Sequence, residues 1–115
     1  MPSSGRKRTQ LSAEQMDRVF HALSDATRRG IIQRLSRGPA LVSELAAPVR
    51  LSRMAVSKHV RVLEQAQLIR REINGREHRC SLAAGPLQEV DQWLVPYREF
   101  WAGTLGRLAR FVEEG

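Results

Sequence analysis

The segment between Leu41 and Leu68 constrains the fold most, because its helix and turn signals follow one another at short intervals. A short helix is expected over 42–47, and Pro48 ends it because a proline cannot continue the backbone hydrogen-bond pattern of a helix. After a four-residue turn, Ser52 is a good N-cap for a longer helix that runs to about residue 67. The sequence therefore predicts two helices joined by a tight turn.

The next segment has the signals of a β-hairpin. Asn74-Gly75 lies between two β-capable runs, 68–73 and 76–82, and an Asn-Gly pair is the strongest short-range hairpin signal. We expect this pair to form the turn, because both central residues of such a turn must accept positive φ. The two runs are rich in arginine and too polar to be buried on both faces, so the hairpin should project from the domain.

Helix signals also lie on both sides of this region. Ser12 begins a capping-box pattern at the start of a helix expected over 13–23. A second helix is expected between Asp25 and Gly38, and a last helix over 87–113. The predicted fold class is therefore mainly α with a small β-hairpin, an α+β arrangement in which four helices precede the hairpin and a fifth follows it.

The positive charge of the chain is concentrated in its middle third. The 115 residues include 19 Lys and Arg and 12 Asp and Glu, for a net charge of +7. Residues 50–79 hold eight basic and three acidic side chains, whereas residues 80–115 hold three basic and five acidic ones. A concentrated cationic region indicates a polyanionic partner. We expect residues 1–10 to form a flexible basic arm and residues 11–115 a single domain.

On a helical wheel, the helix that follows Ser52 has two faces of opposite character. Val56, Val60 and Leu63 lie on one side, and cations and small hydrogen-bonding groups lie on the other. An inserted helix needs such groups to contact bases and phosphates in the major groove of DNA. The residues of this helix that we expect at DNA are Ser52, Arg53, Met54, Ser57, Lys58 and Arg61. Arg61 and Ser52 are expected at phosphates, and the other four at base edges.

A hairpin directly after such a helix is typical of a winged helix-turn-helix. In that fold the wing lies over the DNA backbone or the minor groove, where arginines are favoured by the phosphate potential. Arg71, Arg76 and Arg79 lie on or beside the expected turn and are predicted to take that role. Together the helix and the hairpin predict a DNA-binding module.

Several stretches resemble the ArsR (arsenic-repressor) family of bacterial winged-helix repressors. Residues 22–32, ALSDATRRGII, are similar to the family segment LADPTRRAIL, and residues 51–63, LSRMAVSKHVRVL, are similar to its recognition helix LSQPAVSRHLRVL. Gly75-Arg76 is similar to the wing, and residues 93–101, WLVPYREFW, resemble a subgroup with the signature WLxxYRxFW. The resemblance covers about four fifths of the chain.

The resemblance implies a bacterial homodimeric transcriptional repressor that binds an inverted repeat, a near-palindromic operator, in double-stranded DNA. Many relatives sense metals, with a thiolate site on the first helix of the helix-turn-helix or with Asp and His pairs on the last helix. Here residues 42–47 hold no Cys or His, and the last helix has Asp91 but no histidine. We therefore expect a subgroup without the metal-site cysteines, with no metal ligands and no cofactor; the effector, if there is one, is unknown.

The last helix carries more apolar surface than one small subunit can cover. From Leu87 to Phe111 its residues at steps of three and four are apolar except for Thr104, and a second strip lies beside them. Such a surplus indicates a partner surface, and the resemblance implies that the first and last helices pack across a twofold axis. The expected dimer residues are Met16, Val19, Phe20, Leu87, Val90, Leu94, Tyr97, Trp101, Leu105 and Leu108. We also expect Pro96 to kink or break this helix.

Other functional classes find little support. No Gly-rich phosphate loop, activated nucleophile or paired carboxylates are evident, so we expect no enzyme. The single cysteine, Cys80, excludes an intramolecular disulfide, and with His78 at i and i+2 it is expected on one strand face as a small core residue. There is neither an apolar run long enough to span a membrane nor a secretory signal, so we expect a cytoplasmic protein.

Two alternatives to a specific repressor stay open. One is a winged helix that binds nucleic acid without sequence preference, in an architectural role or on RNA. The other is a protein-interaction module in which DNA binding is vestigial. Sequence preference and its dependence on salt separate the first from a repressor, and substitution of Ser57 and Lys58 tests the second.

Overall fold

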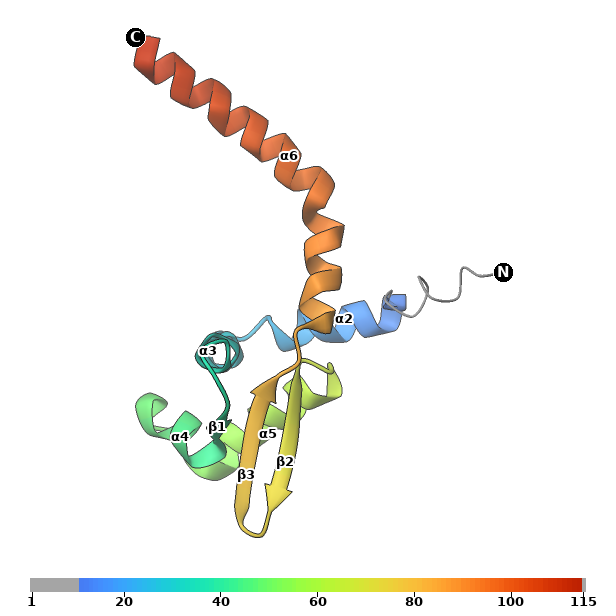
Figure 1. Ribbon diagram of the computed structural model, residues 1–115, viewed down its shortest axis with the longest axis vertical. Coiled ribbons are helices and arrows are strands. Elements are labelled where there is room, and N and C mark those ends of the chain that lie inside the picture. The colour runs from blue at the N-terminus through green and yellow to red at the C-terminus, as the bar shows by residue number, and fades with distance from the viewer. Residues whose placement is uncertain (1–10, 115) are drawn as a thin grey trace, which may run out of the picture.

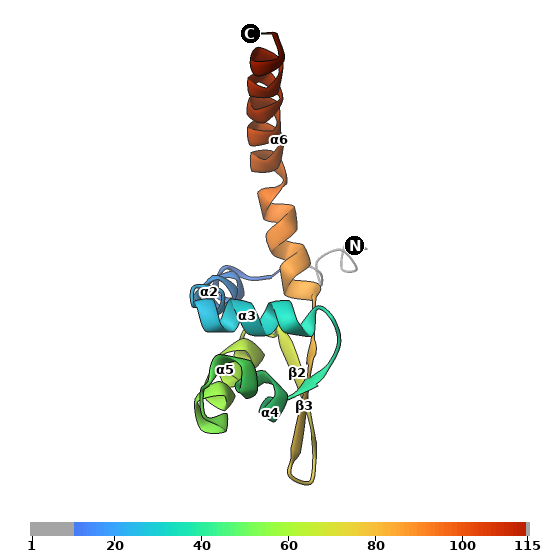
Figure 2. The same ribbon diagram turned by 90° about the vertical axis from the view of Figure 1, so that its left-hand side faces the viewer.

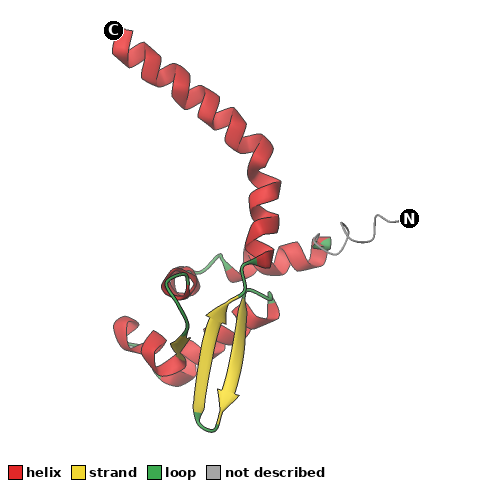
Figure 3. Cartoon of the chain, viewed as in Figure 1, coloured by secondary structure: helices red, strands yellow, loops and turns green. Residues whose placement is uncertain are grey.

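The computed structural model describes residues 11–114, apart from the side chains of Leu105 and Glu114, so the basic arm expected over residues 1–10 lies outside the described residues. The elements follow one another as helices and short strands, coloured along the chain in Figure 1 and by type in Figure 3. In chain order they are α2 (Ala13–Ala22), α3 (Ala26–Leu35), β1 (Ala40–Leu41), α4 (Val42–Ala46), the 3-10 turn η1 (Ala47–Val49), α5 (Arg53–Gln65), β2 (Ile69–Asn74), β3 (Glu77–Leu82) and α6 (Gly85–Glu114).

Side-chain caps begin the helices where the sequence predicted them. The Ser12 hydroxyl accepts from the backbone N–H of Gln15 at 3.1 Å, and the Gln15 side chain accepts from the Ser12 N–H at 3.0 Å, which completes a capping box. The Asp25 carboxylate caps α3, and the Ser52 hydroxyl caps α5 by accepting from the N–H of Ala55 at 3.1 Å. These predicted helix starts are confirmed.

The sheet contains a strand that the sequence did not predict. Its order is β1-β3-β2, all antiparallel, and the two residues of β1 pair with Cys80 and Arg79 of β3. A strand of two residues has no periodicity of its own, because its place depends only on the neighbour with which it pairs.

The hairpin turn differs by one residue from the prediction. Asn74 pairs with Glu77, so the turn residues are Gly75 and Arg76 instead of Asn74 and Gly75. Gly75 has φ +65°, and Arg76 is not among the residues with positive φ. Glycine with positive φ at the first central position is the pattern of a type II′ turn, which fits the twist of a hairpin as well as the expected type I′ does.

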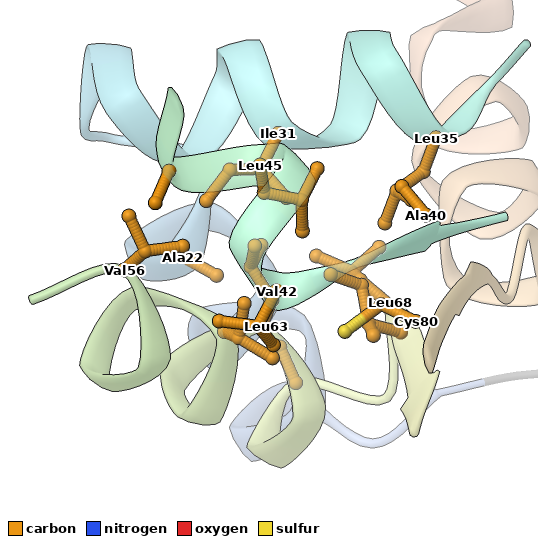
Figure 4. Close-up of a cluster of buried hydrophobic side chains, with 14 of the residues drawn as sticks. Ala22, Ile31, Leu35, Ala40, Val42, Leu45, Val56, Leu63, Leu68 and Cys80 are labelled. Carbon is orange, nitrogen blue, oxygen red and sulfur yellow. The ribbon is translucent and has the colours of Figure 1, made fainter. Parts of the chain in front are cut away.

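The hydrophobic core lies between the helices α2 to α5 and the base of the hairpin (Figure 4). Val56, Val60 and Leu63 of α5 are completely buried, and so is Cys80 of β3. The predicted apolar side of α5 therefore faces the core, which leaves the opposite side of the helix outward.

Helix α6 continues far beyond this core. It runs from Gly85 to Glu114 as one helix and changes direction part-way along its length, and Pro96 lies inside it (Figure 1). A proline cannot donate to the carbonyl four residues earlier, so the prediction of a kink is confirmed and a break into two helices is not found. Figure 2 shows α6 and the hairpin extending from opposite ends of the molecule. The radius of gyration is 18.3 Å, whereas about 13 Å is expected for a compact chain of this length.

Candidate nucleic-acid interface

The outward face of α5 carries the side chains that the sequence placed at DNA. Arg53, Met54, Lys58 and Arg61 are exposed, and Met54 is 71% exposed although it is apolar. Ser57 is half-buried on the same helix. An exposed methionine among cations can lie on a thymine methyl group.

Arg28 holds α5 to the helices behind it. Its Nε donates to the backbone oxygen of Ala22 at 2.7 Å, and its Nη2 donates to that of His21 at 3.2 Å, so the guanidinium covers the C-terminal carbonyls of α2. Its Nη1 lies 3.2 Å from Nδ1 of His59 on α5, and because a guanidinium only donates, the imidazole nitrogen accepts. His59 follows directly after Lys58, so this contact orients the part of α5 that faces outward.

Asp25 completes this group. Its carboxylate lies 3.9 Å from Nδ1 of His59 and accepts from the backbone N–H of Arg28 at 3.0 Å. That backbone hydrogen bond, together with the positive charge of Arg28, lowers the pKa of Asp25 below its ordinary value. The resemblance marked this stretch of sequence, but the contacts of Arg28 and Asp25 with His59 join residues far apart in the chain, so the sequence alone did not show them.

The wing arginines occupy three different environments. Arg76 is exposed at the turn, and Arg79 is exposed on the sheet face where it pairs across the strands with Glu72. Arg71 instead points toward α5, where its Nη2 and Nε donate to the two carboxylate oxygens of Glu64 at 2.7 and 3.2 Å. The Arg71 side chain is only 10% exposed. In the free chain Glu64 therefore holds the Arg71 guanidinium, which does not face outward as Arg76 and Arg79 do.

A groove separates the start of α5 from the wing. It has a volume of about 430 Å³, and Arg53 and Ser57 line it from α5 while Arg76 lines it from the wing. The remaining lining residues are Leu41, Val42, Ser43, Glu77 and His78. The groove brings together predicted residues from two different elements, the recognition helix and the wing.

The cations on this side lack acidic partners within the described part of the chain. Among residues 11–114 the ion pairs are those of Arg71 with Glu64 and of Arg98 with Asp91, and the Asp25 carboxylate lies near the imidazole of His59. None of them involves the exposed cations of α5 or of the wing turn. This surface therefore has a positive potential that solvent and salt screen.

The expected dimer residues differ in how far each of them is buried. Val19 is completely buried in the subunit's own core, so its place at an interface is contradicted. Leu87 and Val90 pack against the same core and are partly buried. The side chain of Leu105 lies outside the described residues. Members with exposed surface are Phe20, Tyr97, Trp101 and Leu108, and Met16 and Leu94 are half-buried.

An aromatic cluster joins α2 to α6 at the centre of this surface. The ring of Phe20 lies edge-on to Trp93 with centroids 5.7 Å apart, and Trp93 lies 5.2 Å from Tyr97. All three rings remain exposed over 40% or more of their surface, at 41%, 51% and 49%. Trp93 and the exposed Phe100 belong to the second apolar strip noted in the sequence, although they were not named among the expected dimer residues.

The remaining sites offer little chemistry. Cys80 is a buried free thiol, and its burial raises the pKa of that thiol above its ordinary value. Nδ1 of His78 accepts from Arg71 at 3.0 Å. Within residues 11–114, no three His, Cys, Asp or Glu side chains lie together as metal ligands. No helix in the described ranges is both long and apolar enough to cross a bilayer.

Comparison with known proteins gives consistent similarities. A family described as a helix-turn-helix domain matches residues 23–72. The HTH-type transcriptional regulator Rv2034 of Mycobacterium tuberculosis is 51% identical over 53 residues, which cover 46% of this chain and half of that protein. The transcriptional repressor SdpR of Bacillus subtilis is 32% identical over 82 residues, which cover 71% of this chain and 91% of that protein.

Solved structures agree with these relatives. The crystal structure of the ArsR family transcriptional regulator RHA00566 is 40% identical, with a TM-score of 0.73, and the match covers 81% of this chain and 96% of that one. A winged helix-turn-helix DNA-binding domain from Mycobacterium bovis, described as homodimeric, is 19% identical with a TM-score of 0.61 and covers 76% and 82%. The second likeness concerns the fold alone, and the predicted winged helix-turn-helix fold is confirmed.

Proposed function

Because this chain belongs to the ArsR family of transcriptional regulators, we propose that it represses transcription as a homodimer bound to a near-palindromic operator in double-stranded DNA. Membership of the family confirms the resemblance seen in the sequence. It also confirms that the chain is not an enzyme, since the relatives are named as transcriptional regulators. SdpR is a transcriptional repressor, and we propose the same role for this chain.

The observation that carries the proposal is the exposed cationic face of α5 beside the groove. Arg53 and Ser57 on α5 lie across that groove from Arg76 on the wing. A helix in the major groove and a wing over the adjacent backbone would engage one duplex from both sides of it. The proposed contact residues are Ser52, Arg53, Met54, Ser57, Lys58, Arg61, Arg76 and Arg79, and Arg71 is left out because Glu64 holds it.

The dimer is proposed on the exposed aromatic surface of α2 and α6. Phe20, Trp93 and Tyr97 form one patch, and Trp101 and Leu108 continue it along α6. Aromatic rings of this kind are enriched at the centres of interfaces. Two subunits joined here would place two copies of α5 on one duplex, and successive major grooves lie about 34 Å apart. The operator is therefore expected to be a near-palindrome.

We further propose that DNA binding does not depend on a metal ion. The support is the donor set itself, because residues 42–47 hold no Cys or His and Cys80 is buried. Zinc is usually held by four Cys, His or carboxylate donors. We expect the purified protein to contain no stoichiometric metal and a chelator to leave operator affinity unchanged; one metal ion per subunit would contradict this.

A regulator that binds chromosomal DNA would act in the cytoplasm of a bacterium, and we propose that location for this protein.

The decisive experiment is selection of genomic DNA fragments by the purified protein, followed by titration of the selected fragment. The double variant Ser57→Ala/Lys58→Ala should abolish operator binding while the dimer persists in sedimentation equilibrium. Gln65→Ala, which removes an exposed polar group from the other end of α5, is the matched control and should bind normally.

Two results would favour the alternatives. Binding that falls with salt in the same way for every fragment would indicate a nonspecific nucleic-acid-binding protein, because phosphate contacts carry no sequence information. Unchanged binding by the double variant would place α5 outside the interface and favour a protein-interaction module.

A further inference from the structure

The wing and α5 are joined by a charged contact that the proposed DNA interface does not use. Arg71 on β2 makes two parallel hydrogen bonds to the carboxylate of Glu64 on α5, at 2.7 and 3.2 Å. The third donor group of the same guanidinium bonds to Nδ1 of His78 on β3, at 3.0 Å. One side chain therefore connects the recognition helix to both strands of the wing.

This contact lies where the wing leaves the body of the protein. Ile69 at the base of β2 is buried, whereas residues 72–77 are all exposed. Arg71 and His78 thus make the last covered contacts before the free part of the hairpin. Below them, a backbone turn after α5 sets the start of β2, with Gln67 at φ +63° and the N–H of Leu68 donating to the oxygen of Leu63 at 2.9 Å.

A bidentate arginine–carboxylate pair fixes direction as well as distance, because two parallel bonds restrict rotation about either one. An apolar contact at the same place would hold the wing to α5 without defining its angle. Arg76 lies five positions beyond Arg71, at the free end of the hairpin. A change in the angle of the wing at Arg71 therefore moves the Arg76 guanidinium further than it moves the atoms near Arg71.

We propose that Glu64 and Arg71, with His78, are positioning residues that hold the wing at the angle at which Arg76 and α5 engage the same duplex. The inference rests on the proposed function and deepens it, since it assigns Arg71 an action through Arg76 in place of a DNA contact of its own. Glu64 would thus contribute to DNA binding by holding Arg71, although a negative charge is itself unfavourable beside DNA.

A double-mutant cycle on the selected operator tests this assignment. Arg71→Ala and Arg76→Ala should each weaken binding on the order of tenfold and lower the salt slope by about one. If Arg71 acts through Arg76, the double variant should bind within about twofold of Arg76→Ala, because the second substitution has nothing left to remove. Arg70→Ala removes a charge from the exposed position next to Arg71 and should bind within about twofold of the unaltered protein.

The exchange Glu64→Arg/Arg71→Glu separates positioning from direct contact. It restores an ion pair with reversed direction, so it should recover operator affinity relative to Arg71→Ala, which a direct contact by Arg71 would not allow. Thermal unfolding midpoints are measured for all variants. If Arg71→Ala lowers the midpoint, Glu64→Gln, which keeps the shape of the side chain, replaces it in the cycle.

Three outcomes would overturn the inference. Additive losses in the cycle would assign Arg71 a contact of its own. An exchange variant that folds normally but binds no better than Arg71→Ala would remove the positioning role. Failure of the unaltered protein to select any fragment would instead refute the proposed function, and this inference with it.

Discussion

The region from α2 to β3 and the helix α6 use apolar side chains in opposite ways. In the first region Val56, Val60 and Leu63 lie at helical spacing and are completely covered by the rest of the chain. In α6, Phe100 and Leu108 also follow helical spacing, but they are 75% and 58% exposed. The same periodic pattern thus describes a core in one region and an uncovered surface in the other.

The difference teaches that, beyond its first turns, α6 gains little stability from packing against its own subunit. Leu87 and Val90 pack against the core and Trp93 meets Phe20, whereas the later residues of α6 extend away from the domain. Most helical stability in proteins comes from the packing of an amphipathic face and not from intrinsic helix propensity. We therefore expect the two regions to respond differently to equivalent substitutions.

The largest effect is expected in the core. Leu63→Ala should lower the free energy of unfolding by about 2–5 kcal/mol, because Leu63 is completely buried and its removal leaves a cavity that neighbouring side chains fill only in part. Urea unfolding followed by circular dichroism measures the loss. The same substitution at Leu108, made at a protein concentration low enough for monomers, should have a much smaller effect; an equal loss there would break the comparison.

The second effect should appear in the dissociation constant of the dimer and not in the stability of the fold. Trp101→Ala should weaken the dimer by about 2 kcal/mol, roughly 30-fold in its dissociation constant, because aromatic anchors carry most of the energy of an interface. Sedimentation equilibrium measures this constant. A Trp101→Ala variant with an unchanged dissociation constant would place the interface elsewhere on the molecule.

A smaller effect is expected at the start of the recognition helix. Ser52→Ala removes the hydroxyl that accepts from the Ala55 N–H and should lower the free energy of unfolding by about 1 kcal/mol. Thermal unfolding of the free protein measures this, with Ser52→Asp as the control because aspartate restores a cap. If Ser52→Ala unfolds like the unaltered protein, the cap does not stabilise α5.

The smallest effect depends on pH. The pKa of Asp25 is lowered in the folded chain, mainly by the hydrogen bond from the Arg28 N–H, so its charged form stabilises the fold above the ordinary value of 3.8. This contribution is lost as the pH falls through the lowered pKa. The difference in unfolding free energy between the unaltered protein and Asp25→Ala should therefore shrink below about pH 4. A difference that stays constant over that range would show that the charge of Asp25 has no part in it.

Local features of this molecule could be predicted because they depend on residues close together in the chain. The caps at Ser12, Asp25 and Ser52 are each formed with an N–H three residues later, so the spacing alone locates the helix starts. The outward face of α5 was also predictable, since a helix that buries one stripe must expose the other. The turn was displaced by one residue because Gly75 takes the first central position of a type II′ turn, which requires positive φ at that position only.

What the sequence by itself determined is therefore the order of the main helices and the hairpin, the cationic face of α5 and the family to which the chain is similar. The tertiary structure decided which distant residues meet: Val19 lies in its own core, β1 pairs with β3, and Arg71 binds Glu64 and not solvent. The physical reason is the separation along the chain between the residues that interact. Caps and helical faces follow from backbone geometry over a few residues, whereas a buried side chain or an ion pair depends on how separate elements pack, and periodicity does not contain that information.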